Sequence, residues 1–210
     1  DRPPRRRLGA PGPRPGHAMT TPPHHPTPAN SPADRPRDAI PELMRGLPVD
    51  LRRDLPIPAS TALYPDGTPD FSTVDGRAAF RLATTGRCGI CGNPFDREVA
   101  FLGGPGAVQA RAYHDPPMHE SCGEASTRLC PALARHHRRR PTDRRSTGAI
   151  PADSSADLPE VWVMWICRGF AVAVPDGYPV FRPQPPIRLR TYAYTPDGRL
   201  AETTRPPTRP

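Results

Sequence analysis

Four residues near the middle of the chain have the types and the spacing of a metal site. Cys88 and Cys91 stand in the stretch Arg-Cys-Gly-Ile-Cys-Gly, and His119 and Cys122 follow in the stretch Pro-Pro-Met-His-Glu-Ser-Cys. Thiolate and imidazole groups are the usual ligands of structural Zn²⁺, which takes four of them in a tetrahedron. Two close pairs on either side of a longer segment supply such a set. We therefore expect these four side chains to bind one structural zinc ion.

Two further residues compete for a place in the second ligand pair. Cys130 lies eight residues beyond Cys122. In a helix this separation is about 12 Å along the axis, too far for both thiols to reach one ion. His114 lies five residues before His119 and remains open as an alternative ligand, because spacing fixes the second pair only loosely. The other interpretation of His114 is an exposed loop histidine.

The use of cysteine also favours a metal over disulfide bonds. Five cysteines are an odd number, and no apolar segment typical of a secretory signal lies near the start of the chain. We therefore expect a cytoplasmic protein with reduced thiols. Cys130 and Cys167 would then be small buried hydrophobic residues, since nothing around them in the sequence indicates a nucleophile.

The segments that carry the two pairs have recognisable backbone signals. Gly89 and Gly92 would free the backbone to curl around the first pair of thiols. Proline is well placed at a helix start, so the prolines at 116 and 117 favour a helix from about Met118 to Leu129. His119 and Cys122 would share a face of the first turn of that helix.

Between the two pairs the sequence predicts a hairpin. Its strands would be Val99 to Leu102 and Val108 to Tyr113, joined by the turn Gly-Gly-Pro-Gly at residues 103–106. The loop that carries Cys88 and Cys91 is a zinc knuckle. A knuckle, a hairpin and a helix in this order indicate a treble-clef-like zinc finger. Before the knuckle, Asp75 can cap a helix over 76–83, whose apolar side would consist of Ala79, Phe80 and Ala83.

Three Pro-Asp-Gly tripeptides, at residues 65–67, 175–177 and 196–198, predict tight turns. Short extended stretches flank each of them, so each turn is expected to join a β-hairpin. The paired stretches are Thr61 to Tyr64 with Asp70 to Val74, Phe170 to Val174 with Tyr178 to Phe181, and Leu189 to Tyr194 with Leu200 to Glu202.

The most hydrophobic run in the chain extends from Val161 to Cys167. It is too short to span a bilayer, and its β-branched and aromatic residues favour a central strand that is covered on both faces. Trp162 and Trp165 would point to opposite faces of that strand. We expect both rings to pack in the core rather than to form a stacking surface for bases.

Composition limits how much of the chain can fold. Proline supplies 34 of the 210 residues and only 35% of the residues are hydrophobic. We expect a small α+β protein with long disordered tails rich in proline and arginine. The expected divisions are a tail at 1–38, a zinc-finger region at 39–134, a basic disordered linker at 135–158, a β-rich segment at 159–204 that packs on the same domain, and a tail at 205–210. Met19 is an alternative start, which would make the residues before it an upstream extension.

The formal net charge of +8 is concentrated in two segments. Residues 1–18 carry five arginines and one aspartate, and residues 135–145 carry six arginines and one aspartate, so they contribute +4 and +5 and leave −1 for the rest. No lysine occurs, and abundant Arg, Pro, Ala and Gly are what a GC-rich coding sequence produces. Arg135, Arg138, Arg139 and Arg140 could still contact phosphates. The alternative is a solvated linker.

Several of these motifs together resemble an uncharacterised family of small zinc-binding proteins found in high-GC bacteria and their phages. They are the run from Leu47 to Asp75, the Cys-Gly-Ile-Cys-Gly knuckle, Pro-Pro-Met-His-Glu-Ser-Cys, Leu-Cys-Pro and the Trp-Val-Met-Trp-Ile strand. The resemblance covers about residues 42–134 and 160–202. It implies zinc at Cys88, Cys91, His119 and Cys122, and it implies no activity.

A looser resemblance connects the chain with HNH nucleases, which embed a catalytic histidine in a treble clef. His114-Asp115-Pro116-Pro117 is similar to their Asp-His-x-x-Pro strand, with the order of Asp and His reversed. The later Asn and His of a nuclease site have no counterpart, because Glu120, Ser121 and Glu124 occupy the expected helix.

The sequence therefore favours a non-catalytic role for the expected zinc protein, as a nucleic-acid or protein interaction module. Two other classes stay open. One is a metal-dependent endonuclease of the HNH type, and the other is an adaptor for protein assembly that binds no nucleic acid.

Overall fold

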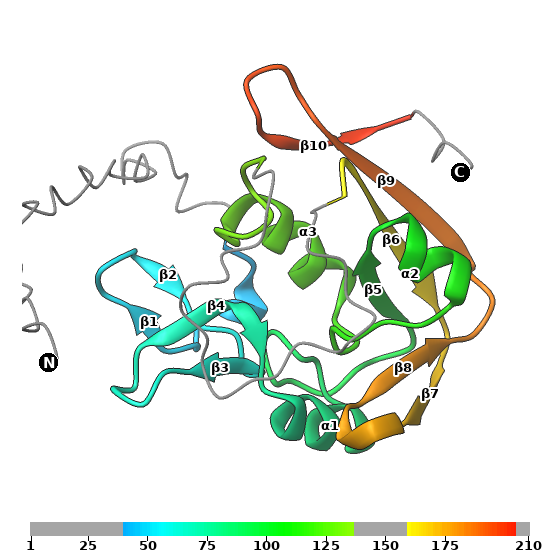
Figure 1. Cartoon of the computed structure of the whole chain (residues 1–210), viewed down its shortest axis with the longest axis horizontal. Coiled ribbons are helices and arrows are strands. Elements are labelled where there is room, and N and C mark those ends of the chain that lie inside the picture. Colours follow the sequence, from blue (N-terminus) through cyan, green and yellow to red (C-terminus); the bar gives the residue numbers. More distant parts are fainter. Residues whose placement is uncertain (1–39, 137–158, 205–210) are drawn as a thin grey trace, which may run out of the picture. The chain divides into compact units, whose positions relative to one another are not determined.

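The structure is a computed structural model that describes residues 40–136 and 159–204, which belong to one compact unit of the chain. Its short elements mix helices and antiparallel strands, as expected for an α+β protein (Figure 1). In chain order they are η3 (Glu42–Met44), β1 (Val49–Asp50), β2 (Leu55–Pro56), β3 (Thr61–Leu63), β4 (Pro69–Val74), α1 (Gly76–Thr84), β5 (Val99–Gly103), α2 (Pro105–Ala110), α3 (Glu120–Leu129), β6 (Val161–Cys167), β7 (Phe170–Ala173), η4 (Pro175–Gly177), β8 (Val180–Pro183), β9 (Arg188–Tyr194) and β10 (Leu200–Thr203).

The largest sheet has four antiparallel strands in the order β10-β9-β6-β5. The hydrophobic strand β6 lies inside it, with Trp165 opposite Phe101 of β5 on one side and opposite Leu189 of β9 on the other. The prediction of a central strand over Val161 to Cys167 is confirmed.

Both faces of β6 are buried, because successive side chains of a strand point to opposite faces. Trp162 belongs to one hydrophobic cluster, together with Met164, Cys88 and Cys122, and α3 covers this face. Trp165 belongs to a second cluster, which contains residues of α1 and of the β7–β8 hairpin. Each tryptophan is only 5% exposed, so the expected core packing of both rings is confirmed.

All three Pro-Asp-Gly turns join antiparallel strands, as predicted. They connect β3 with β4, β7 with β8, and β9 with β10. The glycine of each turn, Gly67, Gly177 or Gly198, has a positive φ, which glycine adopts without steric cost.

The hairpin expected between the two ligand pairs is wrong. The strand Val99 to Leu102 exists as β5, but Pro105 occupies the first turn of α2 with Gly104 as its N-cap, so Val108 lies in a helix. Proline at a helix start has its φ already fixed, and the missing N–H group is not needed there. The chain then returns in extended form, and Tyr113 pairs with Phe181 of β8.

The other two helices lie close to their predicted ranges. Helix α1 begins after Asp75, whose carboxylate accepts hydrogen bonds from the backbone N–H groups of Arg77 and Ala78. Phe80 does not lie on its buried side as expected, because the side chain is 40% exposed. Helix α3 begins at Glu120 rather than at Met118, and His119 is its N-cap residue.

The expected tails at 1–38 and 205–210 lie outside the described residues, as does most of the expected basic linker, including Arg138, Arg139 and Arg140.

Within the described part, no helix has the length and the apolar character needed to cross a membrane.

Candidate metal centre

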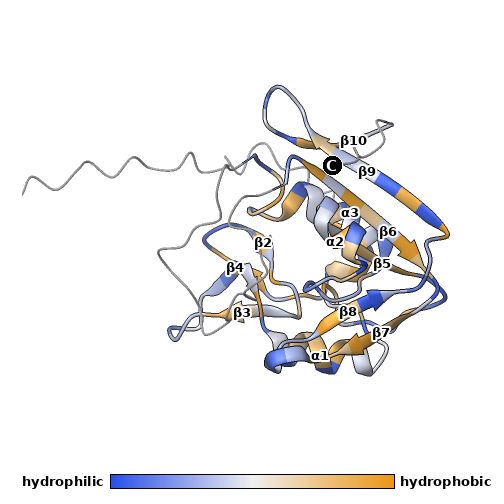
Figure 2. Cartoon of the chain, turned by 45° about the vertical axis from the view of Figure 1, so that its right-hand side comes forward, coloured by the Kyte–Doolittle hydropathy of each residue, from blue (hydrophilic) through white to orange (hydrophobic). Residues whose placement is uncertain are grey.

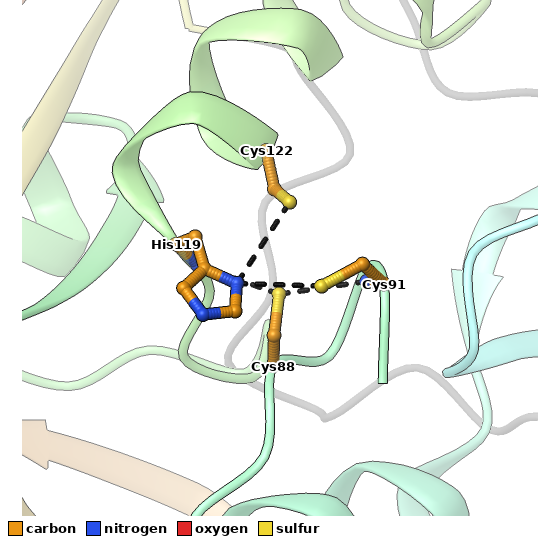
Figure 3. A group of neighbouring side chains, drawn as sticks. All are labelled: Cys88, Cys91, His119 and Cys122. Carbon is orange, nitrogen blue, oxygen red and sulfur yellow. Dashed lines mark hydrogen bonds between the residues drawn. The ribbon is translucent and has the colours of Figure 1, made fainter. Parts of the chain in front are cut away.

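Cys88, Cys91, His119 and Cys122 converge on one point, as Figure 3 shows. One ligand atom from each residue, three Sγ atoms and an imidazole nitrogen, lies within 4.8 Å of all the others. Cys88 and Cys91 come from the loop after α1, whereas His119 and Cys122 come from the start of α3. The four residues chosen from spacing alone are therefore the ones that the fold brings together.

The first pair is held by a tight backbone loop. The Gly92 N–H donates to the Cys88 carbonyl at 2.9 Å, and the Cys88 N–H donates to the Asn93 carbonyl at 2.9 Å. Gly92 has a φ of +73°, so the predicted need for backbone freedom is met at this residue. The loop thus turns Cys88 and Cys91 toward the same side.

Gly89 has a different function from the one expected. Its φ is not positive, but a Cβ atom at this position would lie 2.9 Å from Cβ of Pro116. The Gly89 N–H also donates to the Pro117 carbonyl at 2.9 Å. A side chain would therefore separate the loop of the first pair from the segment that leads into the second pair.

The second pair is positioned by the edge of the sheet. Met118 and Ala100 of β5 exchange two backbone hydrogen bonds, of 2.7 and 2.9 Å. His119 follows as the N-cap of α3, and Cys122 lies in the first turn of that helix. Gly123 allows α3 to approach the sheet, since a Cβ atom there would lie 3.0 Å from Cε of Met164.

The imidazole of His119 has its tautomer fixed by the backbone. Its Nε2 atom lies 3.0 Å from the Pro94 carbonyl oxygen, which can only accept, so Nε2 carries the proton. The Nδ1 atom then has a free lone pair, and it faces Sγ of Cys91 at 3.3 Å and Sγ of Cys122 at 4.0 Å. Histidines that bind a metal through one ring nitrogen typically donate a hydrogen bond from the other ring nitrogen, as Nε2 does here.

The sulfur of Cys88 is prepared to be a thiolate. Hydrogen bonds from the thiols of Cys122 and Cys91 lower the pKa of Cys88 to about 3. The backbone N–H groups of Ile90, Cys91 and His119 also lie 3.4 to 3.5 Å from this sulfur. Conversely, interactions with the neighbouring sulfurs of Cys88 and Cys91 raise the pKa of Cys122. A cation bound among these sulfurs would favour their thiolate forms, which are the forms that bind metals.

The dimensions of the cluster suit a small tetrahedral ion. Bonds of about 2.3 Å to sulfur and about 2.0 Å to nitrogen imply ligand atoms about 3.5 to 3.8 Å apart. The two distances from His119 Nδ1, 3.3 and 4.0 Å, lie on either side of this range. Cys88 and Cys122 are completely buried and Cys91 is 9% exposed. The four donors would therefore fill the coordination sphere of such an ion, with the three sulfurs away from bulk water and His119 partly exposed.

An ion-pair network beside the site fixes α3 to the sheet, and it was not predicted from the sequence. Arg190 of β9 contacts Glu120 at 3.1 Å, Glu124 at 3.4 Å and Glu202 of β10 at 2.7 Å. Arg188 also contacts Glu120. Part of this network could be predicted, because Glu120 and Glu124 share a helix face and Arg188 and Arg190 share a strand face. The sequence gives no signal, however, that these two faces, about 70 residues apart, pair with each other.

The rival ligands lie outside the cluster. Among the residues that the structure describes, no other group of three or more His, Cys, Asp or Glu side chains could hold an ion, so neither His114 nor Cys130 belongs to such a group. The thiol of Cys130 lies 3.8 Å from the Phe71 carbonyl instead, and desolvation of this thiol raises the pKa of Cys130 to about 11. The residue as a whole is only partly buried, so the expectation of a buried Cys130 is wrong. Cys167 is buried, and its thiol donates to the Gly169 carbonyl.

The first residue of the expected phosphate-contacting tract is fixed to the β9–β10 hairpin. Arg135 forms a bridge with Arg199, and its guanidinium donates to the Asp197 carbonyl at 3.5 Å. The His136 ring lies against that of Tyr194, with 4.8 Å between the ring centroids. The structure therefore defines where the tract begins, while Arg138, Arg139 and Arg140 are outside the described residues.

Comparison of the chain with protein-family models, with curated proteins and with solved structures returned no match.

Proposed function

We propose that Cys88, Cys91, His119 and Cys122 bind a single Zn²⁺ ion whose function is structural. The observation that carries this proposal is the convergence of four donors, three sulfurs and one nitrogen, within 4.8 Å of one another. Sites of this composition are typical of zinc, and a site with four protein ligands has no open position for a substrate. The ion would therefore join the knuckle to α3 rather than perform chemistry.

The zinc-binding segment is proposed to be a treble-clef-like finger. In support, the knuckle is followed by β5, and the bridge between Ala100 and Met118 brings the chain back beside β5 just before α3. Helix α2 lies within this excursion, where a simple finger has a short turn. A relation to the uncharacterised zinc-binding family of high-GC bacteria and phages forms part of the same proposal.

The role of the whole protein is proposed to be that of a non-catalytic interaction module that binds nucleic acid. Arg135, Arg138, Arg139 and Arg140 are the proposed phosphate contacts, and the fixed position of Arg135 on the β9–β10 hairpin supports a defined origin for the tract. Guanidinium groups bind phosphate through charge and paired N–H donors.

The zinc site is tested by measuring metal content. The protein purified under reducing conditions should contain one zinc per chain, and Co²⁺ substitution should give the visible absorption of a tetrahedral sulfur-rich site. Cys122→Ser should lose the metal. Cys130→Ser is the matched control and should keep it, because Cys130 lies outside the cluster. Full zinc content in Cys122→Ser would contradict the proposal.

The interaction role is tested by a salt titration of nucleic-acid binding. A variant with alanine at 135, 138, 139 and 140 should bind a labelled oligonucleotide more weakly and with a shallower dependence on salt. Metal-dependent nicking of plasmid that disappears in His114→Ala would instead indicate the nuclease. Absence of binding even at low salt would leave only the protein-assembly adaptor.

A further inference from the structure

Helix α1 has one buried side and one exposed side of unusual composition. Ala78, Ala79 and Ala83 are buried. Ala79 and Ala83 pack in the cluster that contains Phe181. Arg77, Phe80, Arg81 and Thr84 are exposed and, at 100° per residue, form one continuous strip along the helix. Figure 2 shows the mixture of strongly hydrophilic and strongly hydrophobic residues on the α1 ribbon.

Within the part of the chain that the structure describes, the two arginines of this strip have no carboxylate partner. Among the described residues, no ion pair involves Arg77 or Arg81, whereas Arg188 and Arg190 are both paired with glutamates. The helix itself contains no acidic residue, and the carboxylate of Asp75 is used by the N-cap. Arg77 and Arg81 lie one turn apart on the same face, so they present two positive charges to one ligand.

Phe80 belongs to the same strip, next to Arg81 in the sequence, and keeps 40% of its surface exposed. A protein–protein interface usually has a core of several apolar side chains. This strip offers one aromatic ring, two guanidiniums and a threonine whose hydroxyl donates to the Phe80 carbonyl at 2.8 Å. A single ring beside unpaired cations is instead what a single-stranded nucleic acid needs, since its bases stack on aromatic faces and its phosphates seek positive charge.

The strip is held rigidly by its surroundings. The N-cap of Asp75 fixes one end of α1, and the buried alanines fix its inner side. At the other end, the Arg87 N–H donates to the Leu82 carbonyl at 2.8 Å, and Cys88 follows directly. The helix therefore leads into the first ligand pair of the metal centre, and the ring and the two guanidiniums project from a fixed backbone.

We infer that the strip Arg77–Phe80–Arg81 of α1 is a second contact surface for single-stranded nucleic acid. Phe80 stacks on a base, and Arg77 and Arg81 bind the adjoining phosphates. This inference rests on the proposed interaction role and adds to it a site that is independent of the tract at 135–140.

The test measures binding of a fluorescently labelled, mixed-sequence single-stranded oligonucleotide to the full zinc-loaded chain over a range of salt concentrations. The double variant Arg77→Ala/Arg81→Ala should make the negative slope of log affinity against log salt shallower by about 1.4. Phe80→Ala should weaken binding about 5- to 150-fold with an unchanged slope, and Phe80→Tyr should restore it.

The matched control is Arg52→Ala, which removes an exposed arginine without an ion pair from the turn between β1 and β2. Affinity and slope should stay at the values of the unsubstituted protein. Zinc content and far-UV circular dichroism of each variant verify that the fold is retained.

The outcomes separate this inference from the proposed role. If the variants of α1 bind like the unsubstituted protein while the variant of the tract at 135–140 does not, the α1 surface is wrong and the interaction role stands. If no oligonucleotide binds at low salt, both are wrong and only the zinc site remains. If poly-glutamate binds with the same dependence on Arg77 and Arg81 and the oligonucleotide does not, the partner is an acidic protein and the inference is overturned.

Discussion

The two faces of the four-stranded sheet are covered in different ways. On one face, α3 contributes only small buried residues, namely Cys122, Gly123, Ala125 and Thr127. On the other face, large rings pack against one another, with 5.2 Å between the centroids of Phe101 and Tyr113 and 5.7 Å between those of Phe101 and Phe170. The same sheet therefore has one face with little apolar cover from its helix and one face with an aromatic core.

The difference indicates what each face needs in order to stay folded. Burial of aromatic rings stabilises the second face without further help. The first face includes Trp162 and Tyr192 of the sheet, but the helix that covers it supplies candidate metal ligands and the glutamates paired with Arg190 rather than large rings. A structural zinc ion contributes on the order of 10 kcal/mol to folding in small fingers, enough to replace several buried side chains.

Removal of the metal should show this asymmetry most strongly. After chelation, we expect residues 88–95 and 118–129 to lose amide protection in hydrogen-exchange mass spectrometry, because the link between knuckle and α3 is gone. Residues of α1 and of the β7–β8 hairpin should keep most of their protection. Addition of Zn²⁺ is the control and should restore the first set. Equal loss in both sets would mean that the two faces are not stabilised separately.

Truncation of an aromatic ring should affect the other face. Phe181 is completely buried in the cluster with Trp165 and Tyr113. Phe181→Ala should lower the free energy of unfolding by about 3 to 5 kcal/mol, the usual cost of a cavity of this size. Urea denaturation of the zinc-loaded protein measures the loss. The variant should still bind one zinc per chain, and loss of the metal would contradict the separation of the two faces.

Disruption of the ion-pair network should have the smallest effect. Arg190→Gln should lower the free energy of unfolding by about 1 to 3 kcal/mol, because several charged hydrogen bonds to a side chain that is 18% exposed disappear. The matched control is Arg128→Gln, which removes a single exposed pair with Glu124 and should cost about 0.5 kcal/mol or less.

The same variant should change how stability depends on pH. Hydrogen bonds from Arg190 hold the pKa of Glu202 below its usual value of 4.5. A carboxylate with a lowered pKa stabilises the fold above its unfolded pKa, and this contribution disappears as pH falls from about 4.5 through the folded value. Unfolding curves of Arg190→Gln should therefore show a weaker loss of stability in this acidic range. An unchanged pH profile would mean that the pairs with Arg190 do not stabilise the fold.

The sequence signals that succeeded were local. The spacing of Cys88, Cys91, His119 and Cys122 identified the residues that converge, and three Pro-Asp-Gly turns identified three hairpins. Helix α2 was missed because Pro105 was interpreted as part of a turn, although it is equally suited to start a helix.

The signals that failed depend on contacts between distant parts of the chain. The side of α1 that is buried depends on Phe181 and Trp165, which follow about 100 and 85 residues later, so the exposure of Phe80 could not be deduced from the helix alone. The pairing of β5 with β6 and of Arg190 with Glu120 has the same origin. Such contacts decide which of several plausible local arrangements is adopted.

The opposite orientation of Trp162 and Trp165 gives the protein an intrinsic reporter for each side of its sheet. They are the only two tryptophans in the chain, and the indole of Trp165 donates to the Gln184 carbonyl at 2.8 Å, whereas Trp162 packs in the cluster of the candidate ligands. Variants that keep one indole at a time would therefore make the fluorescence of each side visible without any added label.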